Sequence, residues 1–156
     1  MNSKKKQIAM IVVVYLIVFF FFWLSKTTFL DRMEIDSSAV DWEGRKETEK
    51  NSSSETIAIP GFETVRFNAK ETSQMVNFHN PETNECYFKL TMIHPNGTVL
   101  WESNLIEPGK GIYSIKLKDP IEKGEYEKVV LKYECFTLTD QSPLNGSEIN
   151  FKLIVT

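Results

Sequence analysis

The sequence contains few of the residues from which most catalytic and metal sites are built. It has two cysteines and two histidines among 156 residues, and neither His79 nor His94 has a second histidine or cysteine at the spacing of zinc ligands. The motifs of serine hydrolases, zinc peptidases and phosphate-binding loops are also missing from it. We therefore expect no catalytic residue, no metal site and no cofactor, and we predict that the protein is not an enzyme.

Clustered positive charge is the next feature that the sequence lacks. All 21 acidic residues follow Leu24, but only 15 of the 18 basic residues do, so this part of the chain carries an excess of six negative charges. Phosphate binding needs a clustered basic face. A nucleic acid is therefore not an expected partner.

One long segment, residues 8–24, has no charged residue at all. As a helix that rises about 1.5 Å per residue, it would extend roughly 26 Å, slightly less than a hydrocarbon core of about 30 Å. Trp23 and the lysines that precede the segment could lie at the two interfaces. We predict that residues 8–24 form a transmembrane helix whose partner is membrane lipid.

The alternative for this segment is a cleaved signal peptide, which needs small residues before the cleavage site. Residues 22–26 read Phe-Trp-Leu-Ser-Lys and offer no such site, so an uncleaved signal anchor is favoured. Three consecutive lysines at 4–6 precede the segment, and basic residues favour the cytoplasmic side. We expect residues 1–7 to be a cytoplasmic basic stub and the C-terminal part to be extracytoplasmic.

The following segment, residues 25–55, is highly polar and has little periodicity. It ends in the run Asn-Ser-Ser-Ser at 51–54, a flexible composition. We predict a flexible acidic stalk over residues 25–55. Trp42 is interpreted as an incidental aromatic residue of this linker, or as one that rests on the membrane surface; the alternative is a docking point for a partner.

From residue 56 to residue 156, short runs of alternating apolar and polar residues are separated by turn residues every 8 to 12 positions. Residues 86–92 alternate in this way, and Asn-Gly at 96–97 is a strong hairpin signal. The longest run covers 125–138. This texture is typical of an all-β sandwich or barrel, and it predicts a mainly β domain of seven or eight strands.

Two cysteines fall on the apolar faces of their predicted strands. Their order with tryptophan is Cys86, Trp101, Cys135, and Tyr133 lies two residues before the second cysteine. This order resembles the immunoglobulin pattern, in which a disulfide joins two sheets over a tryptophan. The resemblance implies an immunoglobulin-like antiparallel β-sandwich and a Cys86–Cys135 disulfide; the alternative is a pair of buried free thiols.

The domain as a whole also resembles small, mostly uncharacterised membrane-anchored surface proteins of Gram-positive bacteria. The stretches that carry this resemblance are residues 55–61, 80–81, 86–88, 105–110, 131–135 and 143–146. The resemblance implies a location at the cell surface and brings no activity with it.

Aromatic residues are the remaining candidates for a ligand face. Tyr87, Trp101, Tyr113 and Tyr126 could form a stacking surface for a glycan or a peptide. The alternative places Trp101 in the core, because it alternates in phase with Val99.

Three functions are compatible with these observations. The favoured one is a membrane-anchored module that binds a protein or a cell-envelope ligand without catalysis. The second is an accessory or structural subunit of a membrane assembly for secretion, conjugation or cell-wall construction. The third, an enzyme, lacks the necessary constellation of residues.

Overall fold

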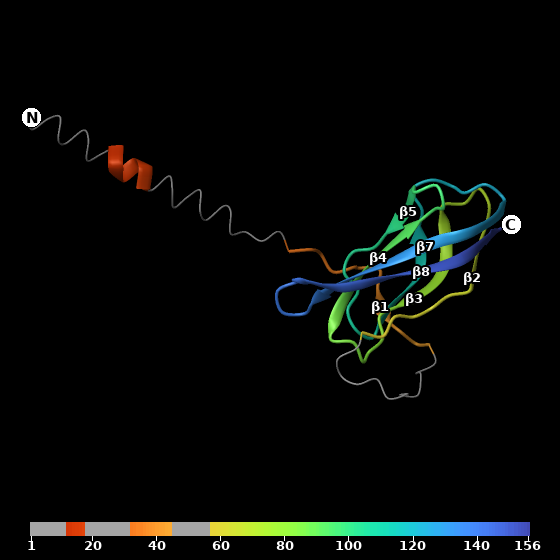
Figure 1. Cartoon of the computed structure of the whole chain (residues 1–156), viewed down its shortest axis with the longest axis horizontal. Helices are drawn as coiled ribbons and strands as arrows, with labels where there is room; N and C mark the ends of the chain where they lie inside the picture. Colours follow the sequence, from red (N-terminus) through yellow and green to blue (C-terminus); the bar gives the residue numbers. More distant parts are fainter. Residues whose placement is uncertain (1–11, 18–31, 45–56) are drawn as a thin grey trace, which may run out of the picture. The chain divides into compact units, whose positions relative to one another are not determined.

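The computed structural model describes residues 12–17, 32–44 and 57–156 (Figure 1). Residues 12–17 are helical, and their six side chains are exposed. Among the described residues, no helix has the length and apolar character needed to cross a membrane. The rest of the predicted span 8–24, the stub 1–7 and residues 25–31 and 45–55 of the predicted stalk lie outside the described residues.

Residues Met33–Thr156 form one compact unit, called the β unit below. Its described residues form eight strands in two sheets, so the prediction of a mainly β fold with seven or eight strands is confirmed. The strands are β1 (Val40–Asp41), β2 (Thr64–Phe67), β3 (Ser73–His79), β4 (Cys86–Ile93), β5 (Val99–Glu102), β6 (Lys110–Lys116), β7 (Gly124–Thr137) and β8 (Pro143–Val155). One sheet has the order β1-β6-β3, and the other has the order β2-β8-β7-β4-β5.

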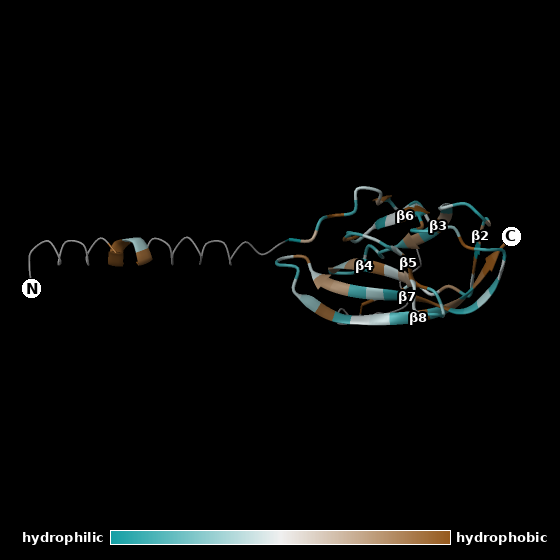
Figure 2. Ribbon diagram, turned by 90° about the horizontal axis from the view of Figure 1, so that it is seen from above, coloured by the Kyte–Doolittle hydropathy of each residue, from teal (hydrophilic) through white to brown (hydrophobic). Residues whose placement is uncertain are grey.

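The centre of the five-stranded sheet is built on regular alternation. β4 and β7 pair antiparallel over eight consecutive residue pairs, and Phe88, Leu90 and Met92 of β4 are fully buried between more exposed neighbours. In Figure 2, bands of hydrophobic and hydrophilic colour follow one another along β7 and β8. Because side chains alternate between the two faces of a strand, one face of this sheet faces the core and the other faces solvent.

One edge of the five-stranded sheet departs from the predicted antiparallel arrangement. β2 pairs with β8 in parallel, from Thr64 opposite Lys152 to Phe67 opposite Val155. Parallel neighbours need a long connection between them, and here the whole chain from β3 to β7 lies between the two strands. The sheet is therefore mixed, and the expectation of a purely antiparallel fold is corrected at this edge.

The two sheets share one hydrophobic core. Phe78 of β3 lies against Trp101 of β5, with ring centroids 5.9 Å apart, and Phe62 meets Phe78 edge to face at 5.2 Å. Ile112 and Ile115 of β6 belong to the same buried cluster as the inner residues of β4, β7 and β8. Burial of this shared apolar surface is the main force that holds the two sheets together.

The two Asn-Gly pairs of the domain adopt different structures. Gly97 adopts a φ of 90° in a turn where its N–H donates to the carbonyl of His94 at 2.8 Å, as the hairpin signal predicts. Asn145-Gly146 carries the same Asn-Gly turn signal, but β8 already begins at Pro143. The pair lies inside the strand, where the register with β7 shifts between Tyr133 and Cys135, as in a β-bulge.

The polar segment before the β domain is not free throughout. Residues 33–44, called the N-terminal strap below, are the first part of the β unit and pair with its later strands. Ile35 forms a parallel bridge with Leu105, and β1 pairs with β6 through Val40 and Asp41. The expectation of a flexible stalk is corrected for these residues, because they fill the edge of the three-stranded sheet.

Trp42 explains why the strap adheres. Its indole stacks on His79, with centroids 3.8 Å apart and planes 9° from parallel, and its Nε1–H donates to Asn77 Oδ1 at 3.0 Å. The backbone N–H of Trp42 also donates to the carbonyl of Gly109 at 2.9 Å. Trp42 is therefore neither an incidental linker residue nor a free docking point; it fixes the strap to β3 and β6.

Candidate functional site

The structure separates the aromatic residues that the sequence proposed as one ligand face. Trp101 on β5 has 8% of its surface exposed and belongs to the core cluster. This agrees with the prediction that Trp101 packs in the core because it alternates in phase with Val99. Tyr87 lies half-buried on β4, directly opposite Phe136 of β7. Of these two residues, Tyr87 alone lies on the outer face of the five-stranded sheet, which we define as the face turned away from the core.

The other two tyrosines have intramolecular roles at separate places. The hydroxyl of Tyr113, on β6 of the three-stranded sheet, accepts a hydrogen bond from the Glu43 N–H at 2.9 Å. The hydroxyl of Tyr126, near the start of β7, donates to the carbonyl of Glu122 at 2.9 Å, and its ring meets His94 edge to face at 5.0 Å. The four aromatic candidates therefore do not form one stacking surface.

The two cysteines are neighbours within one sheet. Phe88 of β4 lies opposite Cys135 of β7, which places Cys86 diagonally across from Cys135 on the same buried face. Both thiols are free in the structure. A disulfide between two sheets, which the immunoglobulin pattern implies, is excluded by this placement because β4 and β7 are adjacent strands of the five-stranded sheet.

The thiols influence each other. A hydrogen bond between them lowers the pKa of Cys86 and raises the pKa of Cys135, and burial adds to the increase at Cys135. Each residue is only 1% exposed, so neither sulfur is accessible to a substrate. The pair is therefore no candidate for a cysteine nucleophile.

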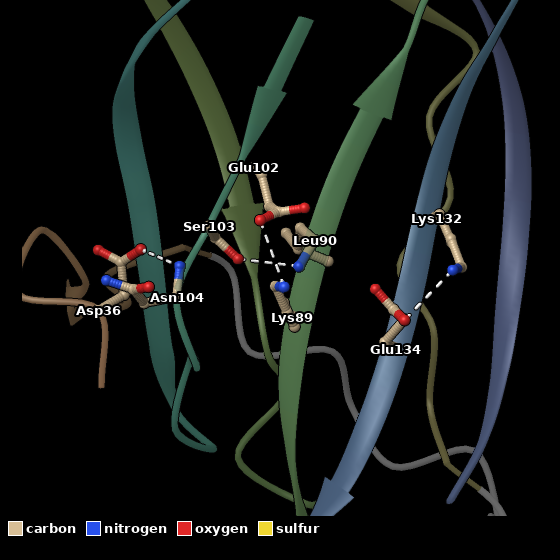
Figure 3. Close-up of polar contacts among 8 residues, drawn as sticks. All are labelled: Asp36, Lys89, Leu90, Glu102, Ser103, Asn104, Lys132 and Glu134. Atoms are coloured by element: carbon tan, nitrogen blue, oxygen red, sulfur yellow. Dashed lines mark hydrogen bonds and ion pairs between the residues drawn. The ribbon is translucent and has the colours of Figure 1, made fainter. Parts of the chain in front are cut away.

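The outer face of the five-stranded sheet carries an ordered set of charges (Figure 3). Lys89 of β4 contacts Glu102 of β5 at 3.3 Å, and Lys132 of β7 contacts Glu134 of the same strand at 3.2 Å. The register places Lys89 opposite Glu134, so opposite charges face each other across β4 and β7. Glu148 of β8 lies opposite Lys132 and continues the pattern.

These ion pairs contribute little to folding. The four side chains of the Lys89–Glu102 and Lys132–Glu134 pairs are between 27% and 47% exposed. Exposed pairs of this kind stabilise a protein by about 0–1 kcal/mol. The alternating charges on this face are therefore available to select a partner by complementary charge.

A groove of about 430 Å³ opens along the β7–β8 hairpin beside these charges. Its lining residues are Lys132, Tyr133, Glu134, Cys135, Phe136, Pro143, Leu144, Gly146, Ser147 and Glu148. The bulge at this position bends the strands, and Gly146 approaches β7 so closely that an added Cβ would lie 2.3 Å from the carbonyl oxygen of Tyr133. The missing side chain at 146 thus allows the close strand approach from which the groove is built.

The groove and the charges together define the candidate site, which we call the outer-face site. Phe136 and Pro143 offer apolar surface, while Lys132 and Glu148 offer one charge of each sign. Such a mixed surface suits an extended peptide or a sugar chain. Among residues 12–17, 32–44 and 57–156, no three His, Cys, Asp or Glu side chains are grouped so that they could hold a metal ion.

Sequence reasoning named one residue of this face, because Tyr87 was proposed as a ligand residue. Lys132 and Glu134 were not proposed, although the two-residue period of a strand places them on one face of β7. Glu148 and Phe136 were missed, because their positions in the site depend on the register of β8 and on the bulge.

Comparison of this chain with protein-family models, with curated proteins and with solved structures found no match.

Proposed function

We propose that this chain is a membrane-anchored module that binds a protein or a cell-envelope ligand on the extracytoplasmic side and performs no catalysis. The observation that carries the proposal is the outer-face site, where a groove and alternating charges lie on a sheet face that folding does not require to be charged. The 17-residue uncharged segment 8–24 supports the anchor, and the three lysines before it support the direction.

The proposal includes an immunoglobulin-like sandwich as the scaffold. Two sheets that share one core, with β3 and β6 on one side and β4, β7 and β8 on the other, support this arrangement. It also includes kinship with the membrane-anchored surface proteins of Gram-positive bacteria, which rests on the sequence stretches quoted above.

Binding can be tested by charge exchange on the outer face. The double change Lys132→Glu with Glu134→Lys keeps the net charge but inverts the pattern, so we expect partner capture from solubilised envelope to fall several-fold. The matched control is Lys152→Glu with Glu125→Lys, which inverts another ion pair of the same sheet, 2.6 Å long, away from the groove. Equal capture by the wild type and both variants would show that the outer face is not the binding surface.

The location can be tested with a reporter fused after Thr156 in the full chain. We expect enzymatic activity of an export-dependent reporter outside the cytoplasm, because the basic stub 1–7 should stay inside. Activity restricted to the cytoplasm would contradict the proposed topology.

An oxidised Cys86–Cys135 pair belongs to the same proposal, because extracytoplasmic compartments favour disulfides. Both thiols are free in the structure, so this bridge would link two adjacent strands and would require them to shift from their present register. We expect a reducing agent to lower the melting temperature of the full chain. An unchanged melting temperature, with two thiols titrating after unfolding without reductant, would contradict the bridge.

The second candidate, an accessory subunit of a membrane assembly, is favoured by one observation. The side chains of the helical residues 12–17 are largely apolar and at least half exposed, with Tyr15 at 73%. A complex that the full chain captures but a chain without residues 1–24 does not would support this candidate over the module.

A further inference from the structure

One side chain of the β7–β8 loop binds the backbone of the first residue of the β unit. Gln141, in the loop between β7 and β8, accepts a hydrogen bond from the Met33 N–H at 2.8 Å and donates one to the Met33 carbonyl at 3.1 Å. Gln141 has a φ of 58°, a left-handed conformation that costs a residue other than glycine free energy. This strained residue therefore holds the chain at the point where it enters the β unit.

Exposed apolar residues lie close to this contact along the chain. Among the described residues of the β unit, five large apolar side chains are exposed. Three of them, Ile35, Leu138 and Leu144, lie within three residues of Met33 or Gln141 along the chain, and each is 42% or 43% exposed. We call these three residues, with the Met33–Gln141 contact, the hairpin end; in Figures 1 and 2 the beginning of the N-terminal strap lies beside the tip of the β7–β8 hairpin.

The length of chain before Met33 limits where the hairpin end can be. Eight residues, 25–32, separate Met33 from the predicted span. Even fully extended, eight residues reach only about 28 Å. β7 alone has 14 residues and is therefore about 46 Å long, so the opposite end of the unit lies beyond the reach of this tether unless the unit lies flat.

We propose that the hairpin end of the β unit rests on the lipid surface of the membrane that holds the anchor, with Ile35, Leu138 and Leu144 in the interface. The proposal rests on the proposed anchor. It adds an orientation of the β unit, in which the remainder of the outer face extends away from the lipid surface.

The charges near the hairpin end determine how deep this contact is. Asp140 and Glu34 are exposed there, and hydrogen bonds from Thr137 and Ser142 lower the pKa of Asp140, so that its carboxylate stays ionised at neutral pH. A charged carboxylate is costly to transfer into hydrocarbon. The contact is therefore at the level of the headgroups, and it does not require an anionic lipid.

The test uses the full chain reconstituted in phosphatidylcholine vesicles that contain a spin-labelled phosphatidylcholine as quencher. A fluorophore is attached at Thr139→Cys, beside the apolar residues, or at Asp119→Cys, just before the opposite end of β7. Cys86 and Cys135 are each 1% exposed and do not compete for the label in the folded protein. We expect the label at 139 to be quenched about threefold more strongly than the label at 119.

Matched variants link the quenching to the apolar side chains. Leu138→Ser with Leu144→Ser, in the Thr139→Cys chain, should bring the quenching down to the level seen at 119. Met75→Ser should leave it unchanged, because Met75 is 72% exposed but lies on β3, away from the hairpin end. Circular dichroism confirms that each variant is folded.

The outcomes separate this proposal from the anchor on which it rests. Release of the chain from vesicles by alkaline carbonate would overturn both the anchor and the lipid contact. Retention of the chain with equal quenching at 139 and 119 would overturn the lipid contact alone. Protection of position 139 from a bulky maleimide in native membranes, without quenching in lipid vesicles, would show that a protein covers the hairpin end and would likewise overturn it.

Discussion

The centre of the five-stranded sheet and the N-terminal strap at the edge of the three-stranded sheet are held by different forces. In the five-stranded sheet, β4 and β7 pair over eight consecutive residues, and their inner side chains are almost completely buried. In the three-stranded sheet, β1 pairs with β6 through two residues only, and stacking, hydrogen bonds and one exposed ion pair hold it there. Stability at the centre of the five-stranded sheet comes from burial, while attachment of the strap depends on a few separate contacts.

This difference has a consequence for dynamics. Regions with few buried apolar contacts open locally at a lower free energy than the core. We therefore expect the N-terminal strap to open without unfolding the five-stranded sheet. The following predictions test that contrast, beginning with the largest expected effect.

The largest effect is expected from a truncation in the core. Leu131→Ala removes a fully buried side chain of β7 and should lower the free energy of unfolding by about 3 kcal/mol. Urea denaturation of the full chain in detergent, followed by near-ultraviolet circular dichroism, measures the change. The neighbouring Lys132→Ala, on the outer face, should cost less than about 1 kcal/mol. Equal losses in the two variants would contradict the assignment of faces.

The second effect concerns the bulge. Gly146→Ala places a Cβ 2.3 Å from the Tyr133 carbonyl oxygen, so the backbone must shift, at a cost of about 2 kcal/mol. Gly61→Ala is the control, because nothing lies within 4 Å of a Cβ at that position. The same urea titration compares them. A Gly146→Ala protein as stable as the wild type would show that the strands are not this close.

The third effect is local. Trp42→Ala removes the stack on His79 and the hydrogen bond to Asn77, so the strap should open more readily by about 2 kcal/mol while the urea midpoint changes little. Hydrogen exchange of a peptide that covers residues 33–44, read by mass spectrometry, detects the opening. Val40→Ala is the control within the strap, since Val40 is 51% exposed. Exchange as slow as in the wild type would mean that Trp42 does not hold the strap.

The smallest effect depends on pH. The hydrogen bond and charge of Lys110, 2.7 Å from Asp41, lower the pKa of Asp41. A group whose pKa is lowered on folding stabilises the folded state above its unfolded pKa, about 4 for aspartate, and this contribution is lost as the pH falls through the folded value. At neutral pH, hydrogen exchange of residues 33–44 should therefore be slower in the wild type than in Asp41→Asn.

The Lys110–Asp41 ion pair should also respond to pH and to salt. The difference between the wild type and Asp41→Asn should shrink below about pH 4 and should also shrink in high salt, because both groups are exposed. A difference that grows as the pH falls would show that the pair opposes strap attachment.

Much of the core was predictable from local pattern. The alternation that places Phe88, Leu90 and Met92 on one face of β4 follows from the two-residue period of a strand, and the structure buries all three. The turn at Gly97 was predictable because Asn-Gly tolerates a positive φ. These features depend on residues close together in the sequence.

Other features could not be predicted because they depend on contacts between distant residues. Trp42 contacts Asn77 across 35 positions, and nothing in the polar composition around Trp42 indicates that partner. Asn145-Gly146 carries the same turn signal as Asn96-Gly97, yet pairing with β7 extends the strand through it. The candidate site depends on that pairing, so only Tyr87 of its face was proposed from the sequence.

The sequence by itself determined the division of the chain into an uncharged N-terminal segment and a mainly β part, because hydropathy and strand alternation are local properties. Only the tertiary structure decided which strands are neighbours, that the two cysteines share a sheet, that the strap closes an edge, and that a bulge opens a groove. The reason is physical: a strand's faces are set by its own residues, whereas its partners and register are set by which distant segments bury the most surface together.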